Sequence, residues 1–298
     1  MKNKVIARIK GGLGNQLFCY AAARRLAVVN NADLVIDDVT GFVRDHTYQR
    51  RYALDHFSIP CRKATAWEHM EPFERGRRAI SKWLARRQPF ERRFYIEQEG
   101  SVFDPRLLVL KPKHTIYLDG LWQDERYFAD IAPIIRSELR FRSSSINARQ
   151  QLAQHISECQ SVALHVRWFD KATISVSAKN LADAYYQQAI QMIEQQAKSA
   201  HYFVFSDDIE AAVRKLQLPP HKVTCVDHDP GDEGAILDLW LMSQCKHFVM
   251  ANSTFSWWGA WLGRSNNGLL LMPADVPRMA GGLIWDGNRN WIDDPGTV

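Results

Sequence analysis

Residues 5–37, VIARIKGGLGNQLFCYAAARRLAVVNNADLVID, combine two apolar runs with a glycine loop and a helical pattern. The apolar run at 5–9 predicts a strand, the glycines at 11–14 a tight loop, residues 15–29 a helix and residues 33–37 a second strand. A strand, a helix and a strand in this order form a βαβ unit with parallel strands. This end of the chain therefore predicts an α/β fold.

Strand and helix patterns alternate regularly from about residue 160 onward. Helical patterns occupy residues 180–197 and 233–245, and apolar runs predict strands at 161–166, 201–205, 223–226, 247–251 and 269–272. This alternation is typical of a parallel sheet with helices on both faces. One further strand is expected at 114–118. A polar turn at 143–145 divides the chain into expected domains of residues 1–145 and 146–298.

The composition is that of a globular protein. The chain has 298 residues, enough for two domains, of which 46% are apolar and 24% are charged. A formal net charge of +5 suits a protein that handles diphosphates or lies near an anionic surface, and no nucleic-acid-binding motif occurs. We therefore expect no nucleic-acid partner.

The cysteines and the first residues indicate the compartment. Five scattered cysteines without a Cys-x-x-Cys pair predict neither a disulfide framework nor a structural zinc site, and they favour a reducing compartment. The chain begins without the apolar stretch of a signal peptide, and no run of about 18 apolar residues could span a membrane. We expect a cytoplasmic protein.

Residues 73–93 combine many arginines with aromatic and aliphatic residues. One interpretation is an amphipathic helix that rests on the anionic inner-membrane surface, where a lipid-linked acceptor would be found. The other is a solvated helix that covers the N-terminal domain. Both interpretations stay open at this point.

The first candidate site is Gly11-Gly12-Leu13-Gly14-Asn15-Gln16, between a predicted strand and a predicted helix. Glycines let the backbone approach a ligand closely, and the free N–H groups of a helix start attract anions. The motif is not Gly-x-Gly-x-x-Gly, so it does not indicate a nicotinamide cofactor. An ordinary tight turn is the alternative.

The second candidate site is His165-Val166-Arg167-Trp168-Phe169-Asp170. On a strand, His165 and Arg167 project to the same side near the carboxyl end, where parallel sheets bind ligands, and Asp170 follows in the loop. A guanidinium there can stabilise the charge of a nucleoside diphosphate leaving group. Asp170 is the expected catalytic base for an acceptor hydroxyl. A structural Arg–Asp pair is the alternative.

Two further sites follow in the predicted C-terminal domain. Asp238 lies among apolar residues of a helix, and its carboxylate matches the two adjacent donors of guanine, although a salt bridge would also satisfy it. At 252–258 a strand turns into a helix rich in Ser and Thr. Such a turn would hold a phosphate or simply cap the helix.

These residues carry a resemblance to the bacterial α-1,2-fucosyltransferases of glycosyltransferase family 11. The similar motifs are Gly11-Gly12-Leu13-Gly14-Asn15-Gln16-Leu17-Phe18, His165-Val166-Arg167, Phe205-Ser206-Asp207-Asp208, Leu241-Met242-Ser243-Gln244-Cys245 and Ala251-Asn252-Ser253-Thr254-Phe255-Ser256-Trp257-Trp258-Gly259-Ala260-Trp261-Leu262. They occur in order over most of the chain, and the last one is long and specific.

The resemblance implies a GT-B fold, with two Rossmann-like domains facing across a cleft and the GDP-sugar held mainly by the C-terminal one. It implies an inverting transfer of L-fucose from GDP-L-fucose, without metal or cofactor. The acceptor would be a galactose 2-hydroxyl of an oligosaccharide or lipid-linked glycan in surface polysaccharide or O-antigen synthesis.

Similarity to related α-1,6- and protein O-fucosyltransferases suggests residue roles. His165 and Asp238 would read guanine, Arg167 would hold the β-phosphate, Ser253 and Thr254 would bind the diphosphate, and Asn15 would lie near the reacting centre. The expected catalytic residues are Arg167, Asp170 and Asn15. The expected donor-binding residues are Gly12, Gly14, His165, Asp207, Asp238, Asn252, Ser253, Thr254, Phe255 and Ser256.

The chain departs from the family pattern His-Val-Arg-Arg-Gly-Asp-Tyr, because Trp168 and Phe169 replace the second arginine and the glycine. Diphosphate binding should persist, while another GDP-sugar remains open. A metal-dependent GT-A enzyme, built on Asp227-His228-Asp229, would also account for a nucleotide diphosphate site. A carbohydrate-binding protein that has lost turnover is the interpretation without catalysis.

Overall fold

The computed structural model describes residues 2–100, 102–142, 149–168, 180–227, 231–263, 268–273 and 289–292. The chain divides into two compact units, here called the N-terminal and C-terminal domains, and the division falls after Arg140. The expected boundary after residue 145 lies outside the described residues and stays a prediction.

The N-terminal domain is built on a parallel sheet with the strand order β3-β2-β1-β5-β4. The strands are β1 (Lys4–Arg8), β2 (Asp33–Asp37), β3 (Arg62–Lys63), β4 (Tyr95–Glu97) and β5 (Ile116–Asp119). The expected βαβ unit is present, because helix α1 (Leu13–Val29) joins β1 to β2 and packs against both strands. Strands β3 and β4 were not expected from the sequence, since runs of two and three residues give no periodic pattern.

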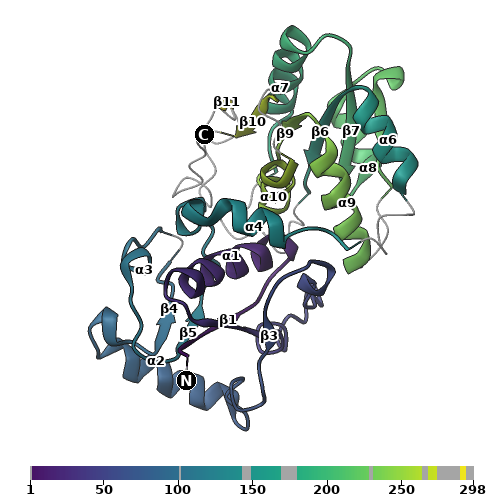
Figure 1. Cartoon of the computed structure of the whole chain (residues 1–298). Coiled ribbons are helices and arrows are strands. Elements are labelled where there is room, and N and C mark those ends of the chain that lie inside the picture. Colours follow the sequence, from purple (N-terminus) through teal and green to yellow (C-terminus); the bar gives the residue numbers. More distant parts are fainter. Residues whose placement is uncertain are drawn as a thin grey trace. The chain divides into compact units, whose positions relative to one another are not determined.

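The N-terminal domain has further helices outside the βαβ unit. α2 (Glu74–Arg86) packs against β4, as Figure 1 shows. The others are α3 (Arg106–Val109), α4 (Ala132–Glu138), and the short 3₁₀ helices η1 (Leu54–His56), η2 (Phe90–Arg92), η3 (Glu125–Tyr127) and η4 (Ala129–Ile131).

Helix α1 begins two residues earlier than the glycine pattern suggested. Gly11 has a φ of +79°, a conformation that favours glycine, and the chain then enters the helix with Gly12 as its N-cap. The Gln16 N–H donates to the Gly12 carbonyl at 3.0 Å. Gly14 is therefore a buried residue of the first helical turn, not part of the loop.

The C-terminal domain is built on a parallel sheet with the strand order β11-β10-β9-β6-β7-β8. The strands are β6 (Gln160–Val166), β7 (Ala200–Ser206), β8 (Val223–Cys225), β9 (His247–Val249), β10 (Leu270–Pro273) and β11 (Arg289–Ile292). The helices are α6 (Gln150–Glu158), α7 (Asp183–Gln196), α8 (Ile209–Leu216), α9 (Asp232–Gln244), α10 (Thr254–Gly263) and the 3₁₀ helix η6 (Pro220–Lys222). The expected strand–helix alternation is confirmed.

Helices cover both faces of this sheet. Val162, Leu164 and Val166 of β6 share an apolar core with α7 and α8. On the opposite face, the His155 ring of α6 lies 5.3 Å from the Phe203 ring of β7. The buried face of α7 includes Tyr185, Tyr186 and Ile190, whereas Ala184 is exposed.

The tryptophans of α10 belong to the core rather than to a sugar-binding surface. Trp257, Trp258 and Trp261 are at most 1% exposed. Their ring centroids lie 5.0–6.2 Å apart, so the three indoles pack on one another.

Two further properties of the described residues concern the cysteines and the apolar character of the helices. All five cysteines are free. Among the residues that the structure describes, no helix has the length and apolar character that a membrane crossing requires.

Candidate active site

Three neighbouring strands of the C-terminal sheet end at one edge. The sheet order places β6 between β9 and β7, and all three run parallel. Arg167 follows β6, Asp207 follows β7, and residues 251–253 follow β9 and lead into α10. Ligands of open parallel sheets bind at this carboxyl edge. The fold thus brings the motifs at 165–167, 205–208 and 251–256 together.

His165 is buried just inside this edge. Its side chain lies on the α10 side of the sheet, with the ring centroid 5.8 Å from that of Phe255. No residue in the described part of the chain bonds to its Nδ1 atom. Burial, with a contribution from the charge of Arg167, lowers the pKa of His165 to about 3. The imidazole is therefore neutral, with one donor and one acceptor nitrogen.

Arg167 and Trp168 share the carboxylate of Asp207. Arg167 Nη1 lies 2.7 Å from Asp207 Oδ2, and the main-chain N–H of Trp168 donates to Oδ1 at 3.0 Å. The Arg167 side chain stays 36% exposed, whereas Trp168 packs against the apolar core on the α7 side. Asp207 thus orients a guanidinium that solvent, or a phosphate, can reach.

The turn before α10 is held by its own hydroxyls. Ser253 Oγ accepts a hydrogen bond from the Phe255 N–H at 3.2 Å, so Ser253 caps the helix, as one interpretation of the sequence proposed. Ser256 is 1% exposed, and its Oγ donates to the carbonyls of Ala251 and Ser253 at 3.4 and 3.2 Å. The expected phosphate site at the start of this helix stays a prediction. The other expected donor-binding residues here, Asn252 and Thr254, are partly exposed.

Asp238 lies in the middle of α9 and is 9% exposed. Helix α9 packs closely on α10, because two glycines of α10 leave no space between them. A Cβ atom at Gly263 would lie 2.2 Å from the carbonyl oxygen of Ser243, and one at Gly259 would lie 2.3 Å from Met242 Sδ. The helix that carries Asp238 is therefore packed against the helix whose start is the expected phosphate site.

Two expected groups fall outside the described residues. Asp170, the expected base, lies within residues 169–179, and His228 and Asp229 of the alternative metal motif lie within residues 228–230. Asp227 is exposed, and its main-chain carbonyl accepts a hydrogen bond from Arg149 Nη2 at 2.8 Å. The part of the chain that the structure describes has no cluster of His, Cys, Asp or Glu that could hold a metal.

The glycine loop of the N-terminal domain positions Asn15. Asn15 Oδ1 accepts a hydrogen bond of 2.6 Å from Gln123 Nε2, in the loop after β5. Gln16, which is 2% exposed, donates to the carbonyls of Gly11 and Arg51 at 3.0 and 2.8 Å. A Cβ atom at Gly12 would have only Arg50 Nε within 4 Å, at 3.8 Å.

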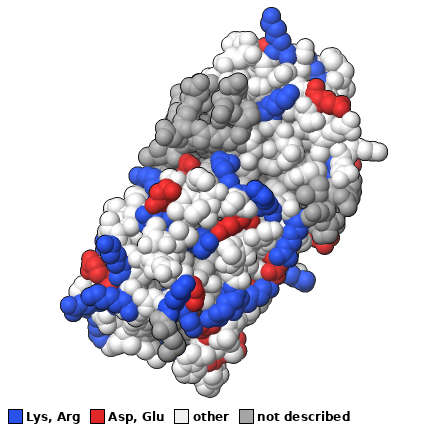
Figure 2. All heavy atoms as spheres, in the orientation of Figure 1, with Lys and Arg blue, Asp and Glu red and all other residues white. Residues whose placement is uncertain are grey.

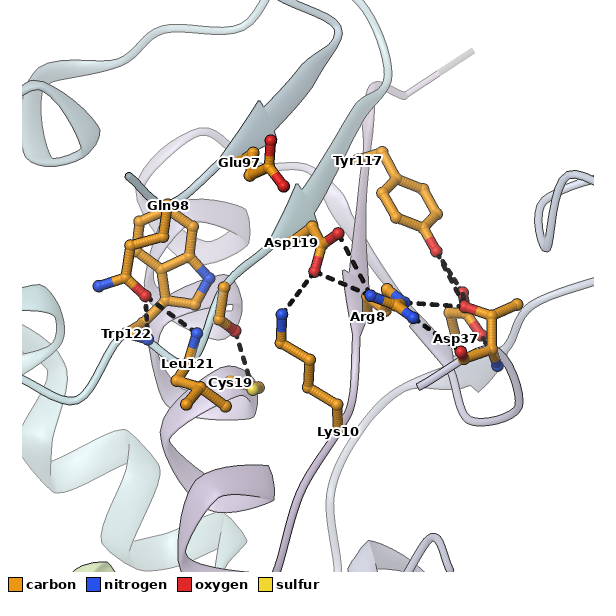
Figure 3. Close-up of polar contacts among 12 residues, drawn as sticks. Arg8, Lys10, Cys19, Asp37, Glu97, Gln98, Tyr117, Asp119, Leu121 and Trp122 are labelled. Carbon is orange, nitrogen blue, oxygen red and sulfur yellow. Dashed lines mark hydrogen bonds and ion pairs between the residues drawn. The ribbon is translucent and has the colours of Figure 1, made fainter. Parts of the chain in front are cut away.

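A polar cluster that the sequence did not suggest occupies the carboxyl edge of the N-terminal sheet (Figure 3). Asp119, at the end of β5, is 2% exposed. It pairs with Arg8 Nη1 at 3.2 Å and Lys10 Nζ at 2.8 Å, and it accepts a hydrogen bond from Tyr95 at 2.6 Å. On the other side of Arg8, the fully buried Asp37 accepts hydrogen bonds from Thr40 and Tyr117, as Figure 3 shows for Tyr117.

The charges of this cluster are balanced. Burial by itself would raise the pKa of Asp119, but Lys10 and Arg8 outweigh it and hold that pKa well below its usual range. The sequence held one signal for this cluster: Arg8, Asp37 and Asp119 lie at or near the ends of three predicted strands. The register of β1 between β2 and β5, which brings them together, is a tertiary property.

Solved structures of similar fold exist. NodZ, an alpha-1,6-fucosyltransferase from Bradyrhizobium whose crystal was soaked with GDP-fucose, matches 88% of this chain with 93% of its own, at a TM-score of 0.53 and 17% identity. At this identity the likeness shows the fold, which is of the GT-B type with two Rossmann-like domains. The alternative of a GT-A fold is therefore wrong.

Sequence relatives extend over most of the chain. Alpha-1,2-colitosyltransferase of Escherichia coli is 30% identical over 274 residues, which cover 90% of this chain and 91% of that protein. The O-antigen biosynthesis glycosyltransferase WbnK of Escherichia coli is 28% identical, covering 89% of this chain and 92% of that protein. The family model "Glycosyl transferase family 11" matches residues 88–280, more than half of the chain. This protein is therefore a glycosyltransferase and belongs to glycosyltransferase family 11.

Proposed function

We propose that the protein transfers L-fucose, with inversion and without a metal ion, from GDP-L-fucose to a galactose 2-hydroxyl of a glycan acceptor in O-antigen synthesis. The observation that carries the proposal is the meeting of His165, the Arg167–Asp207 pair and the start of α10 at one sheet edge. The names of the relatives, an alpha-1,2-colitosyltransferase and an O-antigen glycosyltransferase, support the linkage and the pathway.

The base and the diphosphate of the donor each have a matching group in this arrangement. The carboxylate of Asp238 and the neutral imidazole of His165 would bind guanine, since a carboxylate accepts from two adjacent donors. The diphosphate would lie between the Arg167 guanidinium and the N-terminal end of α10, which carries a partial positive charge. As the glycosidic bond breaks, the leaving diphosphate gains charge, and these groups stabilise it. Asp170 stays our proposed base for the acceptor hydroxyl.

A binding screen tests the nucleotide part of this proposal. Calorimetric titration with GDP, UDP, CDP and dTDP should show GDP binding at least about tenfold more tightly than the others, because a carboxylate at the base edge selects guanine. Equal affinity for GDP and UDP would remove the guanine assignment. Turnover of GDP-L-fucose with a galactose-terminated acceptor then tests catalysis, and donor binding without hydrolysis or transfer would instead favour a non-catalytic sugar-binding protein.

A second donor sugar, colitose, should be tested in the same way, because one relative is named a colitosyltransferase and because Trp168 departs from the fucosyltransferase pattern. Colitose is fucose without its 3-hydroxyl. A site that hydrogen-bonds this hydroxyl would reject the deoxy sugar by about 10⁴-fold, whereas an apolar site would distinguish the two by only about 10² or less. Comparing kcat/KM for GDP-L-fucose and GDP-colitose decides which donor the site fits.

A further inference from the structure

Helix α2 presents its apolar side chains to the outside. Ile80, Trp83 and Leu84 are 59%, 53% and 42% exposed. The side that faces the domain carries Ala85, which is 1% exposed, and Lys82, whose ammonium pairs with Glu97 at 2.5 Å and Asp119 at 3.4 Å. A helix that merely covers a domain has the opposite arrangement, with its apolar side inward. Helix α2 does cover part of the N-terminal domain, but the solvated-helix interpretation does not account for its outward apolar side chains.

Two further aromatic side chains extend this apolar surface. Phe73, the residue before α2, is 81% exposed, and Trp67 is 72% exposed. Trp67 lies beside the helix, because the Arg77 guanidinium carbon is 4.1 Å from the centre of its ring. We call Trp67, Phe73, Ile80, Trp83 and Leu84 the α2 surface. Large apolar side chains grouped in this way mark an interaction site on a water-exposed face.

The same segment is strongly basic. Residues 73–93 contain eight Lys and Arg but only two acidic residues. Figure 2 shows Lys and Arg side chains gathered over the part of the N-terminal domain where Figure 1 draws α2. Arg87 lies over the Trp83 ring, with its guanidinium carbon 3.3 Å from the ring centre. Cations are thus interleaved with the exposed rings rather than set apart from them.

This combination fits an anionic lipid bilayer. Tryptophan and phenylalanine side chains enter the headgroup region, and arginines extend beside them to lipid phosphates. A protein partner would instead need an acidic surface that also accepts five large apolar side chains. We propose that the α2 surface binds peripherally to anionic phospholipid. If the proposed function holds for a lipid-linked glycan, this contact brings the enzyme to the membrane where that acceptor lies.

Vesicle flotation tests the binding without using transferase activity, so its failure is distinct from failure of the proposed function. The full chain should float with vesicles of phosphatidylglycerol and phosphatidylcholine in equal parts, should not float with phosphatidylcholine alone, and should be released by salt. The double variant Ile80→Ser/Trp83→Ser should reduce binding at least about tenfold, through loss of buried apolar area. The variant Arg75→Gln/Arg87→Gln should reduce binding about fivefold for each arginine removed.

Matched controls lie on other parts of the surface. Val109→Ser removes an apolar side chain that is 76% exposed, and Arg214→Gln removes a cation whose side chain is 71% exposed. Both should bind vesicles like the wild type. Because all of these side chains are exposed, thermal stability and GDP affinity should be unchanged in every variant, which shows that the fold is intact.

Two results would overturn the proposal. One is flotation that is equal with anionic and neutral vesicles, or that is unchanged in the α2 variants. The other is a chain that binds no vesicles but self-associates with rising concentration in a manner that Ile80→Ser/Trp83→Ser abolishes, which would make the α2 surface a contact between copies of this chain.

Discussion

Asp238 is the buried acidic residue that α9 holds in the C-terminal domain, and its proposed ligand is guanine. Asp238→Asn replaces one acceptor with a donor, which would face a donor of the base. The variant should bind GDP more weakly by about 1–3 kcal/mol, the range for a buried polar group left without its partner. Calorimetry with GDP measures this loss, and the thermal stability of the free variant serves as the control. Unchanged GDP affinity would contradict the role.

Arg167 should act mainly on the charge of the departing diphosphate. Arg167→Ala should lower kcat/KM about a hundredfold, which corresponds to about 3 kcal/mol of transition-state stabilisation. Arg167→Lys should recover only part of this loss, because a point charge does not reproduce the forked guanidinium that Asp207 orients at 2.7 Å.

Trp168→Arg is the matched control for that prediction. It removes packing against the apolar core, so it should lower thermal stability, but GDP affinity should stay within about threefold, since the Trp168 side chain packs into that core. Kinetics of the three variants with one donor decide between the positions. Near-normal turnover of Arg167→Ala would assign the phosphate to another group.

His165 should make stability depend on pH. Its folded pKa of about 3 lies below the ordinary value near 6.5, so the unfolded chain takes up the proton first as the pH falls. This group therefore contributes full stability above about pH 6.5 and loses about 1.4 kcal/mol per pH unit below it, until the pH nears 3. His165→Gln lacks this dependence.

Thermal unfolding of wild type and His165→Gln at pH 7, 6 and 5 measures the difference (about 2 kcal/mol over this range). His201 and His247, whose pKa values burial also lowers, are present in both proteins and cancel in the comparison. Curves that run parallel over this range would mean that His165 is accessible to protons in the folded state.

The packing of α9 on α10 matters at the scale of secondary structure, because these two helices carry Asp238 and the expected phosphate site. A Cβ atom at Gly263 would meet the Ser243 backbone at 2.2 Å, so the helices must move apart to admit it. Gly263→Ala should therefore destabilise the protein by about 1–3 kcal/mol and weaken GDP binding as well.

Gly76 provides the matched control for that substitution. It lies inside α2, and nothing stands within 4 Å of its added Cβ atom. Gly76→Ala should stabilise the protein by about 0.5–1 kcal/mol, since alanine favours a helix and meets no obstacle. Thermal unfolding of the two variants tests the contrast. Equal effects would show that the contact between α9 and α10 is not tight.

Metal independence is a prediction about the whole molecule. It depends on the fold, which sets the position of the α10 start, and on the charged side chains that stabilise the leaving group. With Arg167 and the α10 start in that role, chelation by EDTA should leave transfer unchanged. The assay needs a chelator series with manganese added back. Loss of activity that manganese restores would mean that a metal ion, for which Asp227-His228-Asp229 is the candidate motif, stabilises the leaving diphosphate.

Local patterns were sufficient to predict much of the fold. The βαβ unit at the N-terminus and the alternating strands and helices after residue 160 were expected, because an apolar period reports which side chains are buried without any knowledge of their partners. The motifs that carry the family resemblance are also contiguous runs of sequence, and the family is confirmed. The site residues stay predictions, although the fold places most of the C-terminal ones at one sheet edge.

Other features depend on contacts between distant residues. The pattern of residues 73–93 indicates a helix with two unlike faces, but only packing against β4 decides that Lys82 turns inward and Trp83 outward. Likewise, Arg8 and Asp119 are 111 residues apart and meet because β1 and β5 are neighbours in the sheet. Sequence periodicity reports burial along one element, whereas strand order, helix orientation and the pairing of charges arise only when separate elements pack together.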